Sequence, residues 1–196
     1  MNLGPCVLNG PRVRLEPLRS SHREGLLAAA QAPEIWTWMS MNLRDPAELD
    51  IWMAKAWAEE EHGLCYPFVV IDQATGEVLG STRYMDIHSA DRGVEIGWTW
   101  YTPTVWGGSV NPEAKWLLLR HAFEDGKALR VVFRTDHENT HSQSAIRKLG
   151  AVYEGTLRNH RIRPDGSIRH TVVFSITPDG WPAVRAGLER RTAYIS

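Results

Sequence analysis

Residues 94–119 hold a pattern whose chemistry is the binding of an anion. An apolar strand, 94–101, is followed by a loop that contains Gly107 and Gly108, and then by Asn-Pro-Glu at 111–113, which is typical of a helix start. The free N–H groups and the dipole of a helix start favour negative charge, and glycine lets the backbone approach a phosphate closely. Taken alone, the glycine pair could also be no more than a turn before a helix.

The composition of this loop narrows the kind of phosphate compound. It lacks the Lys-Ser/Thr ending of a nucleotide-binding loop, so metal-assisted phosphoryl transfer is not indicated. It also lacks the three-glycine fingerprint of dinucleotide sites. A pyrophosphate held by backbone groups alone fits coenzyme A.

The elements that must position this loop follow from apolar periodicity and turn signals. Helices are predicted from Ser20 or Ser21 to about 30, after Pro33, from a cap at Asp45 to about 61, and at 111–125, 139–149 and beyond about 179. Strands are predicted at 12–18, 66–72, 77–84, 94–101, 130–135, 151–155, 158–163 and 167–176. This order predicts a mixed sheet covered by helices. Without linker or repeat, residues 1–196 are expected to form a single domain.

Five segments, in order and over nearly the whole chain, resemble the GNAT acetyltransferase superfamily and, within it, the ribosomal-protein N-terminal acetyltransferase-like group. They read RVRLEPL, EIGWTWY, WGGSVNPEAKWLLLRHAFE, RVVFRTDHENTHSQSAIRKLGAVYEG and LRNHRIRPDGSIRHTVVFSITPDGWPAV. The resemblance implies an α+β fold whose central, mostly antiparallel sheet is splayed at its middle and flanked by helices. It also implies acetyl-CoA as cofactor and direct attack of an amine on the thioester.

The resemblance assigns cofactor contacts residue by residue. The main chain of the splayed strand would pair with the pantetheine amides, the loop would hold the pyrophosphate, and the next helix would touch the far arm. These positions are Trp98, Thr99, Trp100, Trp106, Gly107, Gly108, Ser109, Val110, Asn111, Asn139, Ser144 and Arg147. The alternatives are packing in the sheet for the Trp98 and Trp100 side chains, helix capping for Asn139, and a solvated helix face for Arg147.

The catalytic and acceptor positions also come from the resemblance. Glu95 could take a proton from the amine, and its alternative is a salt-bridged or exposed strand residue. Hydroxyls of Ser142 and Ser144 could reach the leaving thiolate, although Ser142 could instead belong to a helix cap. The acceptor site would be bordered by Trp36, Trp38 and Met39.

Four positions depart from the superfamily pattern. Trp106 stands at the Gln/Arg position of the pyrophosphate loop, Ser109 at its first fixed glycine and Asn111 at its Gly/Ala position. Ile146 stands where a tyrosine frequently protonates the leaving thiolate. The general acid is therefore left unassigned.

Composition excludes several other classes of protein. A formal net charge of -1 argues against binding to nucleic acid or to an anionic membrane. The N-terminus lacks the pattern of a signal peptide, and no apolar run approaches the roughly 20 residues that span a bilayer. Two cysteines, Cys6 and Cys65, argue for a reducing cytoplasm and against a zinc site, so no metal is expected.

Three functions remain open on sequence grounds. The first is acetylation of a protein N-terminal α-amine, the second is acetylation of a small-molecule amine, and the third is a module that holds coenzyme A without turnover. A monomer or a homodimer would suit each. The late hairpin holds four arginines, at 158, 161, 163 and 169, and one acid, Asp165. This basic ribbon could contact the 3′-phosphate of the coenzyme or an acidic partner, and it is interpreted as a charged, protected sheet edge.

Overall fold

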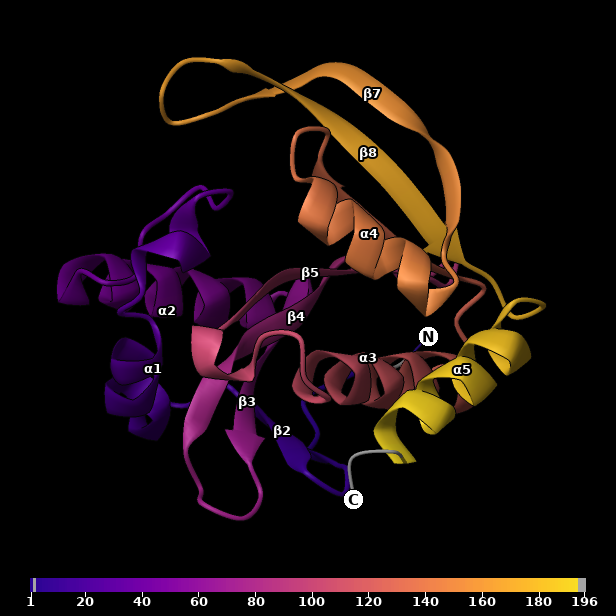
Figure 1. Cartoon of the computed structure of the whole chain (residues 1–196), viewed down its shortest axis with the longest axis horizontal. Helices are drawn as coiled ribbons and strands as arrows, with labels where there is room; N and C mark the ends of the chain where they lie inside the picture. The colour runs from indigo at the N-terminus through magenta and orange to yellow at the C-terminus, as the bar shows by residue number, and fades with distance from the viewer. Residues whose placement is uncertain (2, 194–196) are drawn as a thin grey trace.

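One eight-stranded sheet organises the fold in the computed structural model, which describes residue 1 and residues 3–193 (Figure 1). The strand order is β1-β2-β3-β4-β5-β6-β8-β7, and every neighbouring pair is antiparallel except β5 with β6. The strands are β1 (Leu8–Asn9), β2 (Val13–Pro17), β3 (Cys65–Asp72), β4 (Val78–His88), β5 (Gly93–Tyr101), β6 (Arg130–Asp136), β7 (Val152–Ile162) and β8 (Ile168–Ile176). The mixed, mostly antiparallel sheet that the sequence predicts is confirmed.

Helices cover both faces of this sheet. They are α1 (Arg23–Ala29), α2 (Pro46–Glu61), α3 (Val110–Arg120), α4 (Thr140–Leu149) and α5 (Trp181–Ala193), with 3-10 turns η1 (Ser20–His22), η2 (Pro33–Trp36) and η3 (Pro103–Val105) and a π-helical turn η4 (His121–Asp125). Two predicted helix ends are confirmed. The Asp45 carboxylate accepts a hydrogen bond from the Ala47 amide at 2.8 Å, and Gly150 ends α4 at φ 95°.

Two hydrophobic clusters fill the space between the sheet and its helices. Residues of α3, α4 and α5 pack on one face with Val94 and Ile96 of β5, whereas α1, η2 and α2 pack on the other with Trp100. Figure 1 shows α1 and α2 on one side of the molecule and α3, α4 and α5 on the other. β5 lies at the middle of the sheet and contributes to both clusters, so its side chains reach both layers.

Several boundaries differ from the predictions. α3 begins at Val110 with Ser109 at its N-cap, so Asn111 does not cap it; Val110 is buried and anchors the first turn in the core. The strands expected at 151–155 and 158–163 form one strand, β7, because register shifts at Tyr153/Gly155 and Leu157/Arg161 absorb the irregular sequence. The first and last helices begin two to three residues late, α1 after the turn η1 and α5 at Trp181.

No helix in residues 3–193 combines the length and the apolar character needed to cross a membrane.

Candidate active site

A gap opens in the sheet between β5 and β6. These two strands pair only at Gly93↔Arg130, Val94↔Val131 and Glu95↔Val132. Beyond Glu95, β5 stays paired with β4 as far as Tyr101, while β6 runs on alongside β8. Because the β6-facing edge of β5 has no partner strand there within the described residues, its N–H and C=O groups are available to a ligand. The expected splay of the sheet is confirmed.

A β-bulge at Trp98 shapes the open edge of β5. Ser81 pairs with Trp100 and Arg83 with Gly97, so β5 carries one extra residue between these two pairs. Trp98 adopts φ 49°, a left-handed conformation that is uncommon for a bulky residue. A bulge leaves backbone groups outside the ladder and re-aims side chains, which suits a strand that receives an amide-bearing ligand.

The glycine loop lies between the end of β5 and α3. The Trp106 indole N–H donates to the Tyr101 carbonyl oxygen at 2.9 Å, and the Gly108 amide donates to the Val105 carbonyl oxygen at 3.3 Å. Gly107 takes φ 74°, and a Cβ there would meet nothing within 4 Å. The loop is thus fixed at both sides but exposed at its glycines, with the first amides of α3 beyond them.

Charges around the start of α3 suit an anion. The buried Glu113 carboxylate accepts hydrogen bonds from the backbone amides of Arg12 and Val13 at 2.8 and 2.9 Å. The acid in the first turn of α3 is thus hydrogen-bonded to the start of β2. The Arg12 guanidinium donates to the Ser109 hydroxyl at 3.3 Å, which brings a cation beside the loop. The Asn111 side-chain oxygen is buried without a hydrogen-bond partner among the described residues. Loop, cation and open β5 edge together fit the pyrophosphate and amides of coenzyme A.

Glu95 lies at the point where the gap begins. Its side chain is only 8% exposed and pairs with Arg134, whose Nη1 also donates to the Asp86 carboxylate at 2.7 Å. Burial raises the pKa of Glu95 above its ordinary value, and the charge of Arg134 opposes that shift. A buried carboxylate with a raised pKa is better matched to accept a proton near neutral pH. The sequence gives no local sign of Arg134 or Asp86, because they meet Glu95 only through strand pairing.

The start of α4 lies at the end of β6. The Asn139 side-chain oxygen accepts from the Ser142 amide at 2.9 Å, so both residues belong to the helix cap. Ser142 is half-buried and Ser144 is exposed. The Arg147 guanidinium lies 5.1 Å from the centre of the Phe174 ring, which places it against β8. Ile146, at the position of the family's tyrosine, is buried in the core.

The three residues expected at the acceptor site lie in different surroundings. Trp36 is buried, its ring centre lies 5.2 Å from that of Trp100, and its N–H donates to the Ala30 carbonyl oxygen. Met39 is half-buried against the same cluster, and Trp38 is exposed. The Trp36 side chain is therefore used in core packing. Trp38 and Met39 keep solvent-exposed surface that a ligand could contact.

Two buried cations near the bulge were missed by the sequence reasoning. Lys115 of α3 donates to the hydroxyls of Thr99 and Thr82 at 2.7 and 3.2 Å, and burial lowers its pKa to about 7. Arg83 of β4 lies on the opposite face of the sheet, against the rings of Trp52 and Trp98. Neither lies in a charged sequence motif, so only the fold reveals them.

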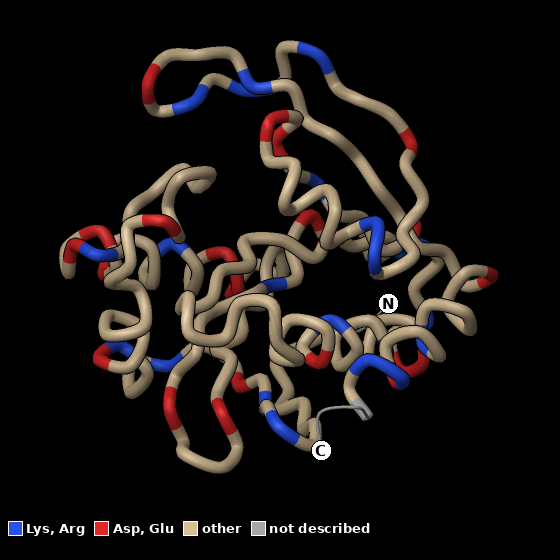
Figure 2. Tube along the Cα trace, in the orientation of Figure 1, with Lys and Arg blue, Asp and Glu red and all other residues tan. Residues whose placement is uncertain are grey.

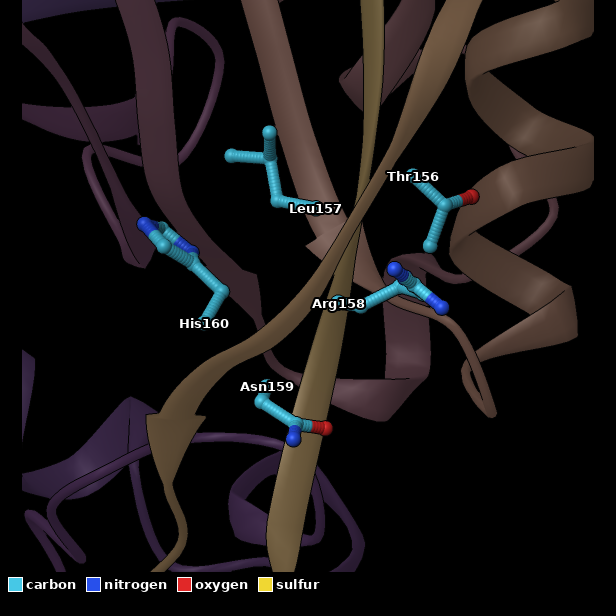
Figure 3. A pocket seen from close by; sticks show the side chains of 5 residues that line it. All are labelled: Thr156, Leu157, Arg158, Asn159 and His160. Atoms are coloured by element: carbon cyan, nitrogen blue, oxygen red, sulfur yellow. The ribbon is translucent and has the colours of Figure 1, made fainter.

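The β7–β8 hairpin reaches over α4 and carries the basic ribbon (Figures 1 and 2). Five residues of β7 line an open hollow, shown in Figure 3: Thr156, Leu157, Arg158, Asn159 and His160. The ribbon faces more acid than Asp165 alone, because Arg163 donates to both Asp136 oxygens and to Glu138. Asp136, His137 and Glu138 are close enough together to hold a metal ion, but Arg163 already occupies two of those carboxylates.

Comparison with known proteins places this geometry among acetyltransferases. Residues 12–152 match the family profile described as acetyltransferase (GNAT) domain. A protein from T. thermophilus, provisionally assigned as an acetyltransferase, shares 35% identity, with a TM-score of 0.86 over 97% of this chain and 99% of that one. A GCN5-related N-acetyltransferase from Brucella melitensis shares 28% identity, with a TM-score of 0.87 over 96% of this chain and 89% of that one.

A more distant solved structure contains the coenzyme. Mycobacterium smegmatis RimJ, in complex with CoA-disulfide, has a TM-score of 0.81 at 23% identity, over 95% of this chain and 94% of that one. At that identity the likeness concerns the fold alone. No curated protein sequence matches the chain.

Proposed function

Because the chain belongs to the GNAT family of acetyltransferases, we propose that it transfers an acetyl group from acetyl-CoA to the N-terminal α-amine of a protein. The observation that carries the proposal is the end of β5–β6 pairing at Glu95 and Val132. Glu95 is thus a buried carboxylate beside the unpaired edge of β5, and the glycine loop follows the C-terminal end of the same strand. An α-amine suits this carboxylate, because a pKa of about 7.7–8.0 leaves it partly neutral at pH 7.

Backbone groups would provide most of the coenzyme site. Amides of Gly107 and of residues 109–111, at the start of α3, would bind the pyrophosphate, with Arg12 adding positive charge. The open edge of β5 at 98–100 would pair with the pantetheine amides, and one amide there would polarise the thioester oxygen. Asn139, Ser144 and Arg147 would line the far arm. When bound, acetyl-CoA supplies an acetyl group activated as a thioester.

The side chains would then manage two protons. Glu95 would accept the proton that the ammonium form of the acceptor must lose, directly or through a water. The amine nitrogen forms the new N–C bond, the C–S bond breaks, and coenzyme A leaves as the thiol. Ser142 or Ser144 would deliver the proton to sulfur, in place of the tyrosine that Ile146 replaces. The overall products are an acetylated amine, coenzyme A thiol and one proton.

A small-molecule amine is the alternative acceptor. The fold and the coenzyme site are common to both kinds of acceptor, so they do not separate them. Trp38 and Met39, beside α2, are the side chains proposed to border either acceptor. Both cysteines are free, which agrees with action in the reducing cytoplasm.

Thiol release from acetyl-CoA tests the proposal. The purified chain is assayed with peptides that begin with Ala or Ser, and in parallel with a panel of small amines. We expect turnover with the peptides. Turnover with small amines only would replace the proposed acceptor, and coenzyme binding without release from any acceptor would support the third possibility, a non-catalytic module.

A further inference from the structure

Arg83 is a buried cation packed against two tryptophans. Its Cζ lies 5.1 Å from the ring centre of Trp52 and 5.1 Å from that of Trp98, and the residue is 4% exposed. The two ring centres lie 6.4 Å apart, so the indoles pack on adjacent sides of the guanidinium and leave its N–H groups to find hydrogen-bond acceptors elsewhere. At one edge, Nη1 lies 3.6 Å from a Glu59 oxygen and 3.7 Å from the Cys65 sulfur.

The other edge of Arg83 has no partner. Nε and Nη2 are both buried without a hydrogen bond to any described residue. These two nitrogens form the side of the guanidinium that binds both oxygens of one carboxylate. A buried donor pair without an acceptor costs free energy, so a water or a ligand must meet it.

Two other arginines of this chain show what such an edge binds. Arg23 places Nε and Nη2 on the two oxygens of Asp50 at 2.6 and 2.9 Å, while its Nη1 holds Glu24. Arg163 places the same pair on Asp136, at 2.8 and 2.9 Å, and also holds Glu138. Each binds one carboxylate through the Nε–Nη2 edge together with a second carboxylate. Arg83 has the second carboxylate, Glu59, but lacks the first.

The position of Arg83 relates its free edge to the acceptor. Arg83 pairs with Gly97, and Met85 pairs with Glu95, in an unbroken stretch of the β4–β5 ladder. Arg83 and Glu95 are therefore diagonal neighbours on one face of the sheet, about 7–8 Å apart at the backbone. The same face carries Trp98 and the cluster that includes Met39. An amine at Glu95 would bring groups a few bonds away within reach of Arg83.

We propose that Arg83 binds a carboxylate that the acceptor carries a few bonds from its amine. This inference rests on the proposed function, since it assigns the acceptor of the same site. The carboxylate could come from an acidic side chain at the second position of a peptide, or from a free amino acid. Side chains that now close the Arg83 edge must move aside when the acceptor binds.

Matched acceptors test the inference on the unaltered protein. One pair of peptides begins Ala-Glu or Ala-Gln and is otherwise identical; a second pair is a free amino acid and its amide. A charged hydrogen-bonded pair gives a preference of roughly tenfold to hundredfold in kcat/KM for the acid. A preference within the peptide pair identifies an acidic side chain as the source, and one within the amino-acid pair identifies a free carboxylate.

Variants locate the preference on Arg83. Arg83→Lys keeps the charge but loses the two-nitrogen edge, and Arg83→Met keeps only apolar volume against the tryptophans. In both variants, kcat/KM for the acid acceptor divided by kcat/KM for its amide should fall to near one. Arg23→Lys, on the surface of α1, removes an equivalent edge far from the gap and should leave the ratio unchanged. If Arg83→Met does not fold, the comparison of the acid preference in Arg83→Lys with that in wild type decides whether Arg83 binds the carboxylate.

The outcomes separate this inference from the proposed function. Thiol release at equal rates from acid and amide acceptors would overturn the role of Arg83 and leave acetyl transfer intact; the edge would then hold water. An acid preference that survives in Arg83→Lys and Arg83→Met would also overturn it. Absence of thiol release with every acceptor would overturn both.

Discussion

Glu95 and Val132 form the last pair of the parallel β5–β6 ladder, and Glu95 also pairs with Met85 on the other side. Beyond this point β5 bulges at Trp98, and its β6-facing edge pairs with no strand of the described residues. Strands on both sides therefore hold Glu95 in place, and the residue lies at the point where β5 and β6 separate. Burial raises the pKa of the Glu95 carboxylate, and the charge of Arg134 opposes that shift.

Replacing Glu95 by Gln should impair chemistry more than binding. The amide cannot accept a proton but keeps the shape of the side chain, so kcat should fall roughly 100-fold or more while the Kd for acetyl-CoA changes little. Steady-state kinetics and calorimetric titration measure the two. Glu61→Gln, at the exposed end of α2, is the control and should behave as wild type. A Glu95→Gln enzyme with wild-type kcat at every pH from 6 to 9 would remove Glu95 as the base.

The pH dependence of turnover should carry the titration of Glu95. Its pKa is raised above the ordinary 4.5 by burial, and only the ionised form accepts a proton. Activity should therefore fall as the pH drops through this raised pKa, and that acid limb should vanish in Glu95→Gln. The same acceptor peptide is used for wild type and Glu95→Gln, so that the titration of its amine affects both pH profiles equally. An acid limb shared by both proteins would assign it to another group.

Lys115 should make the free energy of unfolding depend on pH. Its folded-state pKa is about 7, whereas the ordinary value is 10.5. Between these values the unfolded chain binds a proton that the folded chain does not, so stability should rise with pH from about 7 to 10.5 and stay level below 7. The total effect is about 3–5 kcal/mol.

Urea unfolding of wild type and Lys115→Met across this pH range measures the effect. The methionine should flatten the rise, because it removes the titrating group and fills a similar volume. Equal slopes for the two proteins would show that Lys115 keeps its charge in the folded state.

Gly107→Ala should weaken coenzyme binding. Gly107 has φ 74° and open space around it, so the methyl group meets no protein atom but occupies the side from which a phosphate would approach. We expect the Kd for acetyl-CoA to rise roughly tenfold, with a stability cost of about 1 kcal/mol from the backbone conformation.

Gly76→Ala provides the matched control. Gly76, in the turn between β3 and β4, has φ 77° and the same open surroundings. It should cost similar stability in thermal unfolding without changing the Kd. If both variants bind acetyl-CoA as wild type does, the loop is not where the phosphates lie.

Local signals predicted the parts of the fold that depend on neighbouring residues. Asp45 before Pro46 and Gly150 after Leu149 fix helix ends through their own side-chain and backbone chemistry. The start of α3 was placed one residue late, because burial of Val110 outweighs the capping preference of Asn111. The bulge at Trp98 could not be foreseen, since tryptophan rarely takes positive φ and the register with β4 imposes it.

The site was predictable in its backbone and much less in its charged side chains. The glycine pair before a helix favours a phosphate loop only together with its neighbouring segments, and that role stays a prediction. The partners of Glu95 and the surroundings of Arg83 depend on pairs that the sheet creates between distant segments. In a single sequence such residues are isolated charges within strands, and the sequence does not distinguish a charge that forms a salt bridge from one that contacts a ligand.

Mass spectrometry of an acetylated peptide identifies the nitrogen atom that receives the acetyl group. The chain is incubated with acetyl-CoA and a peptide that begins with Ala and also contains one lysine, and fragmentation locates the added acetyl group. We expect one acetyl group on the α-nitrogen, formed in step with thiol release. An acetyl group on the lysine side chain alone, or an unmodified peptide beside active turnover of small amines, would show that the acceptor is not a protein N-terminus.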